Sequence, residues 1–284
     1  MMGVRWSSPA STGELKISLP RGATRQMSES GVLAEGTWLA QAAGCFQDQV
    51  AIVTGASSGI GRAITLDLAS HGARVCLVAR GREALQSVAD QVIANGGQSR
   101  VCCTDLTRDE DIHTLAGTVQ RSFGRADILV LCGGTIAHGT LERATLAEFD
   151  MQYRSNLRGN YALVQAFLPL LRQQKGQIVF INSSAGMRAS GGSGQHAAAQ
   201  HALRAIADSL REEVNGDGIR VLSVYPGRTA TPRTARLFEK EGRTYQPALL
   251  MQPDDVAAMV TSALSLPRTA EVTDISMRSM VKSY

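Results

Sequence analysis

The sequence predicts an α/β protein with a single doubly wound parallel sheet and helices on both faces of that sheet. From residue 50 onward, short apolar runs alternate with segments of helical periodicity, an alternation typical of parallel strands joined by crossover helices. The chain has 284 residues, of which 44% are hydrophobic and 19% charged. This length and composition fit one globular domain of roughly 240 residues plus an appendage.

The first half of the domain supplies four strands and the helices between them. The run from Val50 to Val53 is short and apolar, and it ends in Thr54-Gly55 where a helix can begin. The same alternation then continues along the chain. We predict strands over 50–53, 73–79, 100–103 and 127–131, and helices over 59–71, 82–94 and 107–123.

The second half of the domain completes the sheet. Pro253 precedes two acidic residues, a combination that favours the first turn of a helix because Pro needs no N–H donor there and acids complement the helix dipole. A long helical stretch and further apolar runs surround it. We predict helices over 146–173 and 195–214 and from Pro253, and strands over 177–181, 219–225 and 271–275.

Residues 1–47 differ in composition from the rest. They are rich in Ser, Gly and Ala, lack a sustained period and lack the apolar core of a secretory signal. We predict a disordered N-terminal extension here, with a start codon assigned too early and a targeting peptide as alternatives. Residues 48–284 then form the single domain.

The overall balance of residue types excludes several classes of function. Basic residues number 29 against 25 acidic ones, and they are spread along the chain, so no nucleic-acid partner is indicated. No apolar run reaches 18 residues, so no membrane span is expected. The five cysteines lack metal-binding spacing. Four of them, Cys76, Cys102, Cys103 and Cys132, lie in apolar runs, which favours small buried side chains, no metal site and a reducing, cytoplasmic location.

A glycine-rich turn follows the first predicted strand and opens the first helix. Gly55 permits a tight turn, while Gly59 and Gly61 allow a pyrophosphate to approach the backbone at the N-terminus of the helix. Ser57, Ser58 and Ile60 complete the turn. The context favours a Rossmann-like dinucleotide site, and a tight turn without a ligand is the alternative.

The end of the second strand indicates which dinucleotide fits. Sheets that select NAD place an acid there, whereas this chain has Arg80 and, two residues on, Arg82. A guanidinium group can bind the 2′-phosphate, so NADP(H) is favoured over NAD(H), unless both are ordinary surface charges. Asp105, at the end of the third strand unit, is placed either to meet the adenine edge or to cap the next helix.

These motifs together resemble the short-chain dehydrogenase/reductase family. The resemblance rests on the glycine turn, Gly134, Asn156, the Ser183 segment and the run from Pro226 to Thr231, and it covers about residue 48 to the end. It implies hydride transfer between a nicotinamide and a carbonyl or alcohol carbon, in dimers or tetramers. It also implies catalytic roles for Asn156 and Ser183. Cofactor contacts are implied at Leu106, Gly134, Pro226, Gly227 and Thr231.

The sequence departs from the family at its chemical centre. The family's Tyr-x-x-x-Lys should begin 13 residues after Ser183, where this chain has His196 and Gln200. No Tyr or Lys lies between Gly176 and Tyr225. The family's Asn-Asn-Ala-Gly is also replaced, by the residues 131–134.

His196 offers a different acid-base group. An unaided imidazole titrates near pH 6.5, and residues four apart share one helix face, so we hypothesise that His196 and Ser183 replace the proton relay. Gln200 can still bond the cofactor's ribose, but it brings no charge. The alternative is a polar pocket residue without a catalytic role.

Two classes of function follow. The first is an NADP-dependent oxidoreductase that acts on a small carbonyl or secondary alcohol. The second is a non-catalytic subunit that binds cofactor and supports an active relative in a mixed oligomer. A homo-oligomer is the default expectation from the family.

Five further side chains border the expected site or its helix. The segment between Thr231 and Pro253 matches the family's substrate lid, with Leu237 and Phe238 able to face a pocket. His138 either borders the pocket or lies in a solvated loop, and Arg233 either binds an anion or is surface charge. His201 is expected to serve packing or an interface.

Overall fold

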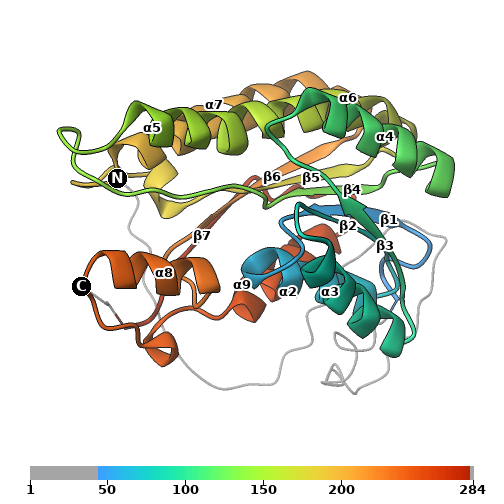
Figure 1. Ribbon diagram of the computed structural model, residues 1–284. Helices are drawn as coiled ribbons and strands as arrows, with labels where there is room; N and C mark the ends of the chain where they lie inside the picture. The colour runs from blue at the N-terminus through green and yellow to red at the C-terminus, as the bar shows by residue number, and fades with distance from the viewer. Residues whose placement is uncertain (1–43, 282–284) are drawn as a thin grey trace, which may run out of the picture. The chain divides into compact units, whose positions relative to one another are not determined.

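The structure, a computed structural model, describes residues 44–281, within which seven parallel strands form one sheet in the order β3-β2-β1-β4-β5-β6-β7 (Figure 1). The predicted fold class is therefore confirmed. Strands β2 and β3 lie on one side of β1, and β4 to β7 lie on the other side. The gap between β1 and β4 is therefore the switch point, where ligands bind in such sheets. The strands are β1 (Val50–Thr54), β2 (Arg74–Ala79), β3 (Gln98–Cys103), β4 (Ile128–Leu131), β5 (Gln177–Ile181), β6 (Arg220–Pro226) and β7 (Asp274–Met277).

Helices cover both faces of the sheet. On one face lie α4 (Asp109–Phe123), α5 (Leu146–Gln152), α6 (Gly159–Gln174) and α7 (Gly194–Val214). On the other lie α2 (Gly59–Ser70), α3 (Arg82–Ala94), α8 (Pro232–Lys240) and α9 (Pro253–Leu264).

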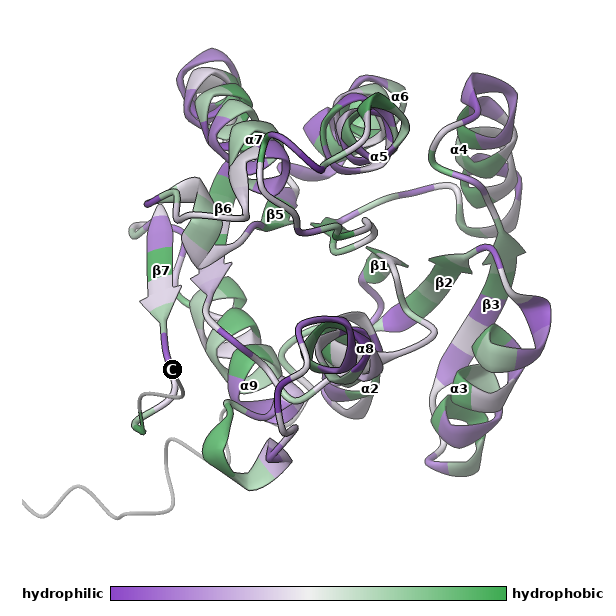
Figure 2. Cartoon of the chain, turned by 60° about the vertical axis from the view of Figure 1, so that its left-hand side comes forward, coloured by the Kyte–Doolittle hydropathy of each residue, from purple (hydrophilic) through white to green (hydrophobic). Residues whose placement is uncertain are grey.

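The strands are apolar on both sides because two separate cores pack against them. In β1, Ala51 and Val53 point into the core with α2, α3 and α9, whereas Val50 and Ile52 point into the core with α4, α6 and α7. Figure 2 shows β1 and β2 as hydrophobic strands between helices of mixed hydropathy. Every residue of β1 is buried, as expected for a central strand.

The packed unit begins slightly before the predicted boundary. Phe46 is 1% exposed, and its ring packs edge-on against His71 at the end of α2. The backbone N–H of Phe46 also donates to the His71 carbonyl at 3.1 Å. The rest of the predicted extension, residues 1–43, lies outside the described residues.

Two predicted elements differ from the structure. The long helix over 146–173 contains a wider π turn, Tyr153–Arg158, between α5 and α6. The last strand pairs over Asp274–Met277 rather than 271–275. The reason is Glu271, whose carboxylate accepts the N–H of Val221 at 2.8 Å and so occupies a backbone donor beside β6.

Burial of the cysteines was predicted correctly in part. Cys76 and Cys102 are buried with their sulfur atoms 3.4 Å apart, and no disulfide is present among the described residues. Cys103 is exposed, and the prediction was wrong there because β3 is an edge strand whose alternate residues face solvent. Cys132 is half-buried at the end of β4.

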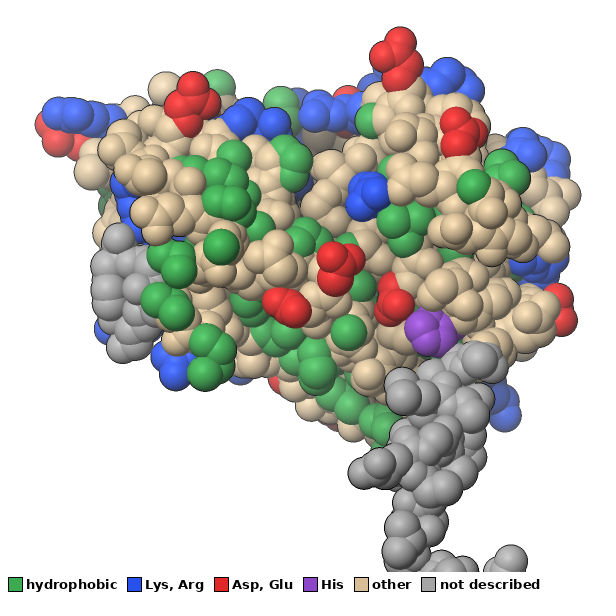
Figure 3. Space-filling view, turned by 90° about the horizontal axis from the view of Figure 1, so that it is seen from below, with side chains coloured by type: hydrophobic (Ala, Val, Ile, Leu, Met, Phe, Trp, Pro, Cys, Tyr) green, Lys and Arg blue, Asp and Glu red, His purple; other side chains and the backbone are tan. Residues whose placement is uncertain are grey.

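On the one face that Figure 3 shows, charge is distributed as the sequence indicated. On that face, basic and acidic side chains are interspersed rather than gathered by sign. None of the helices within residues 44–281 has the length and apolar character needed to cross a membrane.

Asp127 ties the amino-terminal ends of the central strands together. Its carboxylate accepts the N–H of Val50 at 2.8 Å and two bonds from Arg125, at 2.8 and 2.6 Å. The Asp127 side chain is 8% exposed, whereas in the ion pair of Arg172 with Asp217 the side chains are 50% and 45% exposed.

We predict that Asp127→Ala lowers the free energy of unfolding by about 2 to 3 kcal/mol, because a buried N–H and a guanidinium group lose their acceptor. Asp217→Ala is the matched control and should cost less than about 1 kcal/mol, because its pair is exposed. Urea denaturation measures both, and equal losses would contradict the assignment.

Candidate cofactor and substrate site

The hydroxyl group of Thr54 joins the carboxyl ends of β1 and β4. Its oxygen accepts the backbone N–H groups of Cys132 at 2.9 Å and Gly133 at 2.8 Å, and it donates to the Val130 carbonyl at 3.3 Å. Two strands that are adjacent in space but 76 residues apart in sequence are thereby fixed at the switch point.

The glycine turn follows Thr54 directly and leads from β1 into α2. Gly55 has φ +67°, and a Cβ there would stand 2.9 Å from the Cys132 carbonyl oxygen. Gly59 has φ +52°, and a Cβ there would stand 2.9 Å from the Thr231 methyl group. A Cβ on Gly61 would collide with the Gly55 carbonyl. Glycine is therefore required at all three positions, and the third brings helix α2 onto the turn.

The start of α2 fits an anionic ligand. Ser58 is its N-cap but makes no side-chain capping bond, and the first turn contains no acid. The first N–H groups of the helix therefore keep their donor capacity, which suits the pyrophosphate of a dinucleotide. Ser57 and Ile60 flank the cap in the same turn.

The far end of the site contains Arg80, Asp105 and Leu106. Arg80 is exposed at the end of β2, and its charge contributes to lowering the pKa of Asp105. The larger cause of that lowered pKa is the bond from the Thr107 N–H to the Asp105 carboxylate, at 2.9 Å. Asp105 thus organises the turn before α4. Leu106 packs against Gly133, and a Cβ on Gly133 would stand 2.6 Å from the leucine Cδ1.

Asn156 holds the loop after β4 against the π turn. Its Oδ1 accepts the Thr135 N–H and its Nδ2 donates to the Thr135 carbonyl, both at 2.7 Å. A Cβ on Gly134 would stand 2.6 Å from the same Oδ1. Asn156 therefore positions Gly134 and Thr135, and both of its amide atoms are used.

Asn182 contacts both its neighbour Ser183 and the distant residue Gln200. Ser183 caps the short 3-10 turn Ser184–Gly186 by accepting the Ala185 N–H at 3.1 Å. Asn182 donates to the Gln200 carbonyl at 3.1 Å and so fixes this turn to α7. The side-chain Oε1 of Gln200 is buried and has no partner within the described residues. Such an acceptor suits a hydroxyl donor like that of a ribose.

His196 lies on the first turn of α7 and is 6% exposed. Burial, followed by the charges of His138 and Arg233, lowers its pKa from 6.5 to about 4. The expectation that this imidazole titrates near pH 6.5 is therefore wrong, because desolvation disfavours the charged ring. Its Nδ1 has no partner, and no hydrogen bond joins it to Ser183 within residues 44–281.

Helix α8 closes the site from the opposite side. Thr231 caps it by accepting the Thr234 N–H at 3.1 Å, and Gly227, after β6, donates its N–H to Met277. From the first turn, Arg233 donates to the Gly134 carbonyl at 2.8 Å across the site. Of the two predicted pocket-facing residues, Phe238 is buried and Leu237 is half-buried.

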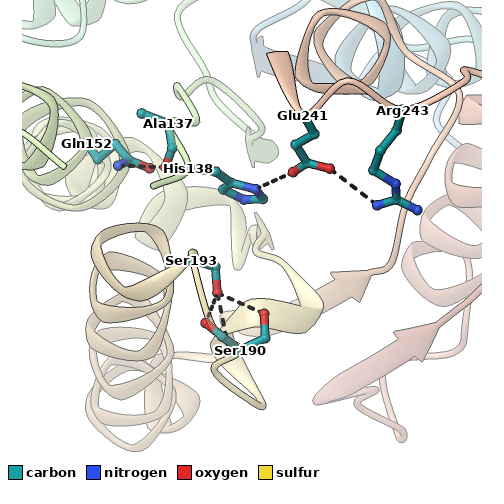
Figure 4. A network of polar contacts seen from close by, with 7 residues as sticks. All are labelled: Ala137, His138, Gln152, Ser190, Ser193, Glu241 and Arg243. Carbon is teal, nitrogen blue, oxygen red and sulfur yellow. Dashed lines mark hydrogen bonds and ion pairs between the residues drawn. The ribbon is translucent and has the colours of Figure 1, made fainter. Parts of the chain in front are cut away.

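A second histidine connects the loop after β4 to the end of α8. His138 Nδ1 lies 3.0 Å from Glu241 Oε1, and Glu241 also pairs with Arg243 at 3.3 Å (Figure 4). The His138 and His196 rings lie 6.1 Å apart between centroids. His138 therefore borders the site, the first of the two alternatives left by the sequence.

Several other features lie apart from the site. Tyr153 and Tyr161 line a hollow of about 480 Å³ between α4 and α6. His201 is exposed on α7, and its Nδ1 lies 2.9 Å from the Ala197 carbonyl. Within residues 44–281 no group of three His, Cys, Asp or Glu side chains has the arrangement of a metal site.

Comparison with known proteins establishes the family. The profile of the short chain dehydrogenases matches residues 49–242, and the chain belongs to this family of oxidoreductases. It is 33% identical over 232 residues to an uncharacterized oxidoreductase of Staphylococcus aureus (strain USA300), covering 81% of this chain and 97% of the relative.

Two other similar proteins extend this comparison. Glycine betaine reductase ATRR of Emericella nidulans is 33% identical over 82% of this chain, which spans 19% of that longer protein. A metagenomic short-chain oxidoreductase in complex with NADP has a TM-score of 0.73 and 31% identity, covering 84% of this chain and 100% of the other.

Sequence reasoning missed two groups near His196. Glu241 is 103 residues from His138, and nothing in the local sequence connects them. Gln195 has both amide atoms buried without a partner in the described part of the chain. In the sequence, the only indication of a role for Gln195 was its position beside His196.

We predict that stability falls below pH 6.5 because of His196. With a folded pKa of about 4 against 6.5 unfolded, the neutral ring stabilises the fold fully above pH 6.5. That stabilisation, about 3 kcal/mol, is lost as the pH falls through 6.5 toward 4. His196→Gln should flatten this slope in urea denaturation at pH 4 to 7, whereas His201→Gln should keep it. Parallel slopes for the parent and His196→Gln would refute the assignment.

Proposed function

We propose that this protein is an NADP(H)-dependent oxidoreductase that interconverts a small carbonyl compound and its secondary alcohol. The observation that carries the proposal is the glycine cradle on the uncapped start of α2, with Arg80 rather than an acid at the end of β2. The similar solved protein that holds NADP supports the same cofactor. When bound, the cofactor supplies or accepts the hydride.

The cofactor's contacts follow from the cradle and its surroundings. Gly55, Ser57, Ser58, Gly59, Ile60 and Gly61 would hold the pyrophosphate, and Arg80, Asp105 and Leu106 the adenosine end. Gly134, Pro226, Gly227 and Thr231 surround the nicotinamide end in this proposal. Gln200 would accept a ribose hydroxyl at its unpartnered Oε1.

The substrate oxygen needs hydrogen-bond donors as negative charge develops on it. Ser183 supplies a hydroxyl group, and a neutral imidazole at His196 supplies one N–H, since its pKa of about 4 leaves the ring uncharged at neutral pH. We propose that His196 and Ser183 take the place of the family's Tyr and Lys in orienting this oxygen, with Asn156 positioning the adjoining loop. Neutral histidine polarises a carbonyl in this way without ionising.

The second candidate is a non-catalytic subunit that binds the cofactor. The simultaneous absence of Tyr and Lys favours it, together with a histidine that is uncharged at neutral pH. Exposed apolar side chains along α5, the π turn and α6 fit either a homo-oligomer or a hetero-oligomer. Leu146 is 83% exposed, Phe149 42%, Tyr153 47% and Tyr161 48%. We retain a homo-oligomer, or a hetero-oligomer with an active relative, and a cytoplasmic location as parts of this proposal.

We predict that Arg80→Ala weakens NADPH binding at least about tenfold, because charge-assisted bonds to the 2′-phosphate are lost. NADH binding should stay within about twofold, since NADH lacks that phosphate. Arg82→Ala is the matched control and should change neither affinity beyond about threefold. Titration calorimetry measures all three proteins, and equal weakening for both cofactors would argue against this corner as the phosphate site.

We predict that the purified protein oxidises NADPH with members of a carbonyl panel between pH 5 and 9. His196→Ala should lower kcat about 100-fold, the cost of one donor to the developing oxyanion. His201→Ala should leave kcat unchanged. Tight NADPH binding without turnover, with activity gained in His196→Tyr/Gln200→Lys, would favour the non-catalytic subunit instead.

A further inference from the structure

Reduction of a carbonyl consumes a proton, and the residues at the expected relay positions do not hold one. The imidazole of His196, with a pKa of about 4, is neutral at neutral pH, and Gln200 does not ionise. Ser183 can donate its hydroxyl proton only if another group restores it. A different group must therefore supply the proton.

His138 is the second imidazole beside this site. Its ring centroid lies 6.1 Å from that of His196, with the two planes inclined by 51°. The loop that carries it is held on both sides of the histidine. Gly139 donates its N–H to the Gly192 carbonyl at 2.8 Å, and Gln152 donates to the Ala137 carbonyl at 3.3 Å.

Glu241 orients the His138 ring. The contact of 3.0 Å is made at Nδ1, so Nε2 remains for proton exchange. The pKa of Glu241 is lowered by His138 and Arg243 despite partial burial, so its carboxylate stays ionised. An ionised carboxylate at hydrogen-bond distance from Nδ1 accepts the proton of that nitrogen and so fixes the orientation of the ring.

The titratable and charged groups around His138 come from α7, from α8 and from the segment that follows α8. Glu241 and Arg243 follow α8, His196 belongs to α7, and Arg233 on α8 acts on His196. Solvent reaches the pair, since the His138 and Glu241 side chains are 24% and 25% exposed. His196 is only 6% exposed. His138 can therefore recover a proton from water, which the buried ring cannot do as readily.

We propose that His138, held by Glu241, is the proton donor of the reduction, while His196 only orients the substrate oxygen. This inference rests on the proposed carbonyl reduction. When the carbonyl carbon accepts a hydride, the oxygen takes the proton from His138 Nε2, directly or through one water. The N–H bond breaks, an O–H bond forms, and the neutral ring regains a proton from solvent. Alcohol oxidation runs the same transfer in reverse.

The same pair also ties the loop after β4 to the end of α8, so the test must separate proton donation from lid closure. Glu241→Gln does this, because glutamine can keep the contact to the ring but carries no charge. His138→Gln removes the ring. His201→Gln is the matched control, a histidine on α7 that faces solvent.

The first measurement is the protonation of His138. Nitrogen NMR of histidine-labelled protein monitors it from pH 5 to 9, and the His138→Gln variant assigns the His138 signal. We expect the ring to lose its proton at lower pH in Glu241→Gln than in the parent, because the carboxylate beside the protonated ring is gone. A ring whose titration is unaffected by Glu241→Gln would overturn the proposal without any assay of turnover.

The second measurement is the pH dependence of kcat/KM with NADPH and a carbonyl that the parent reduces. His138→Gln should lower kcat at least about 100-fold with NADPH affinity within about twofold, as expected for loss of a general acid. In Glu241→Gln, the decline with rising pH should begin at lower pH. His201→Gln should match the parent.

Failures of the two proposals are distinguishable. A parent that binds NADPH but reduces no carbonyl refutes the proposed function and with it the donor role. A parent that is active, with a His138→Gln variant that keeps the parent's rate and pH profile, overturns the donor role alone.

Discussion

The site depends on one hydroxyl group, that of Thr54, which accepts the N–H groups of both residues after β4. This contact sets how closely the ends of β1 and β4 approach. The spacing is so small that a Cβ on Gly55 would stand 2.9 Å from the Cys132 carbonyl oxygen. That junction adjoins the cradle on α2, the Gly134 loop and the contact of Asn156 with that loop. It lies at the point where a doubly wound sheet leaves a crevice.

Burial sets the protonation of the histidine at the centre of this site. A lone buried histidine responds to desolvation by becoming neutral. His196 follows that rule, and its partner Gln200 adds no charge to oppose it. The more exposed His138 is instead paired with a carboxylate. The two histidines therefore lie in different environments.

Most of the fold was predictable because strands and helices leave local patterns. The β1 run and the glycine turn were recognisable from a few neighbouring residues, and strands β2 to β6 fell close to their predicted bounds. The π turn was not predictable, because Tyr153–Arg158 has ordinary helical residue types. The register of β7 depended on Glu271, whose acceptor role arises only when β6 lies beside it. The exposure of Cys103 depended on β3 being the edge strand.

The sequence by itself determined the family and the position of the glycine cradle, and it has His196 and Gln200 where the resemblance led us to expect Tyr and Lys. Those conclusions depend on residue identity and short spacing. The tertiary structure alone decided the pKa of His196 and the meeting of His138 with Glu241, residues 103 positions apart. The physical reason is that protonation depends on which groups and how much water surround a side chain, and long-range packing sets that environment.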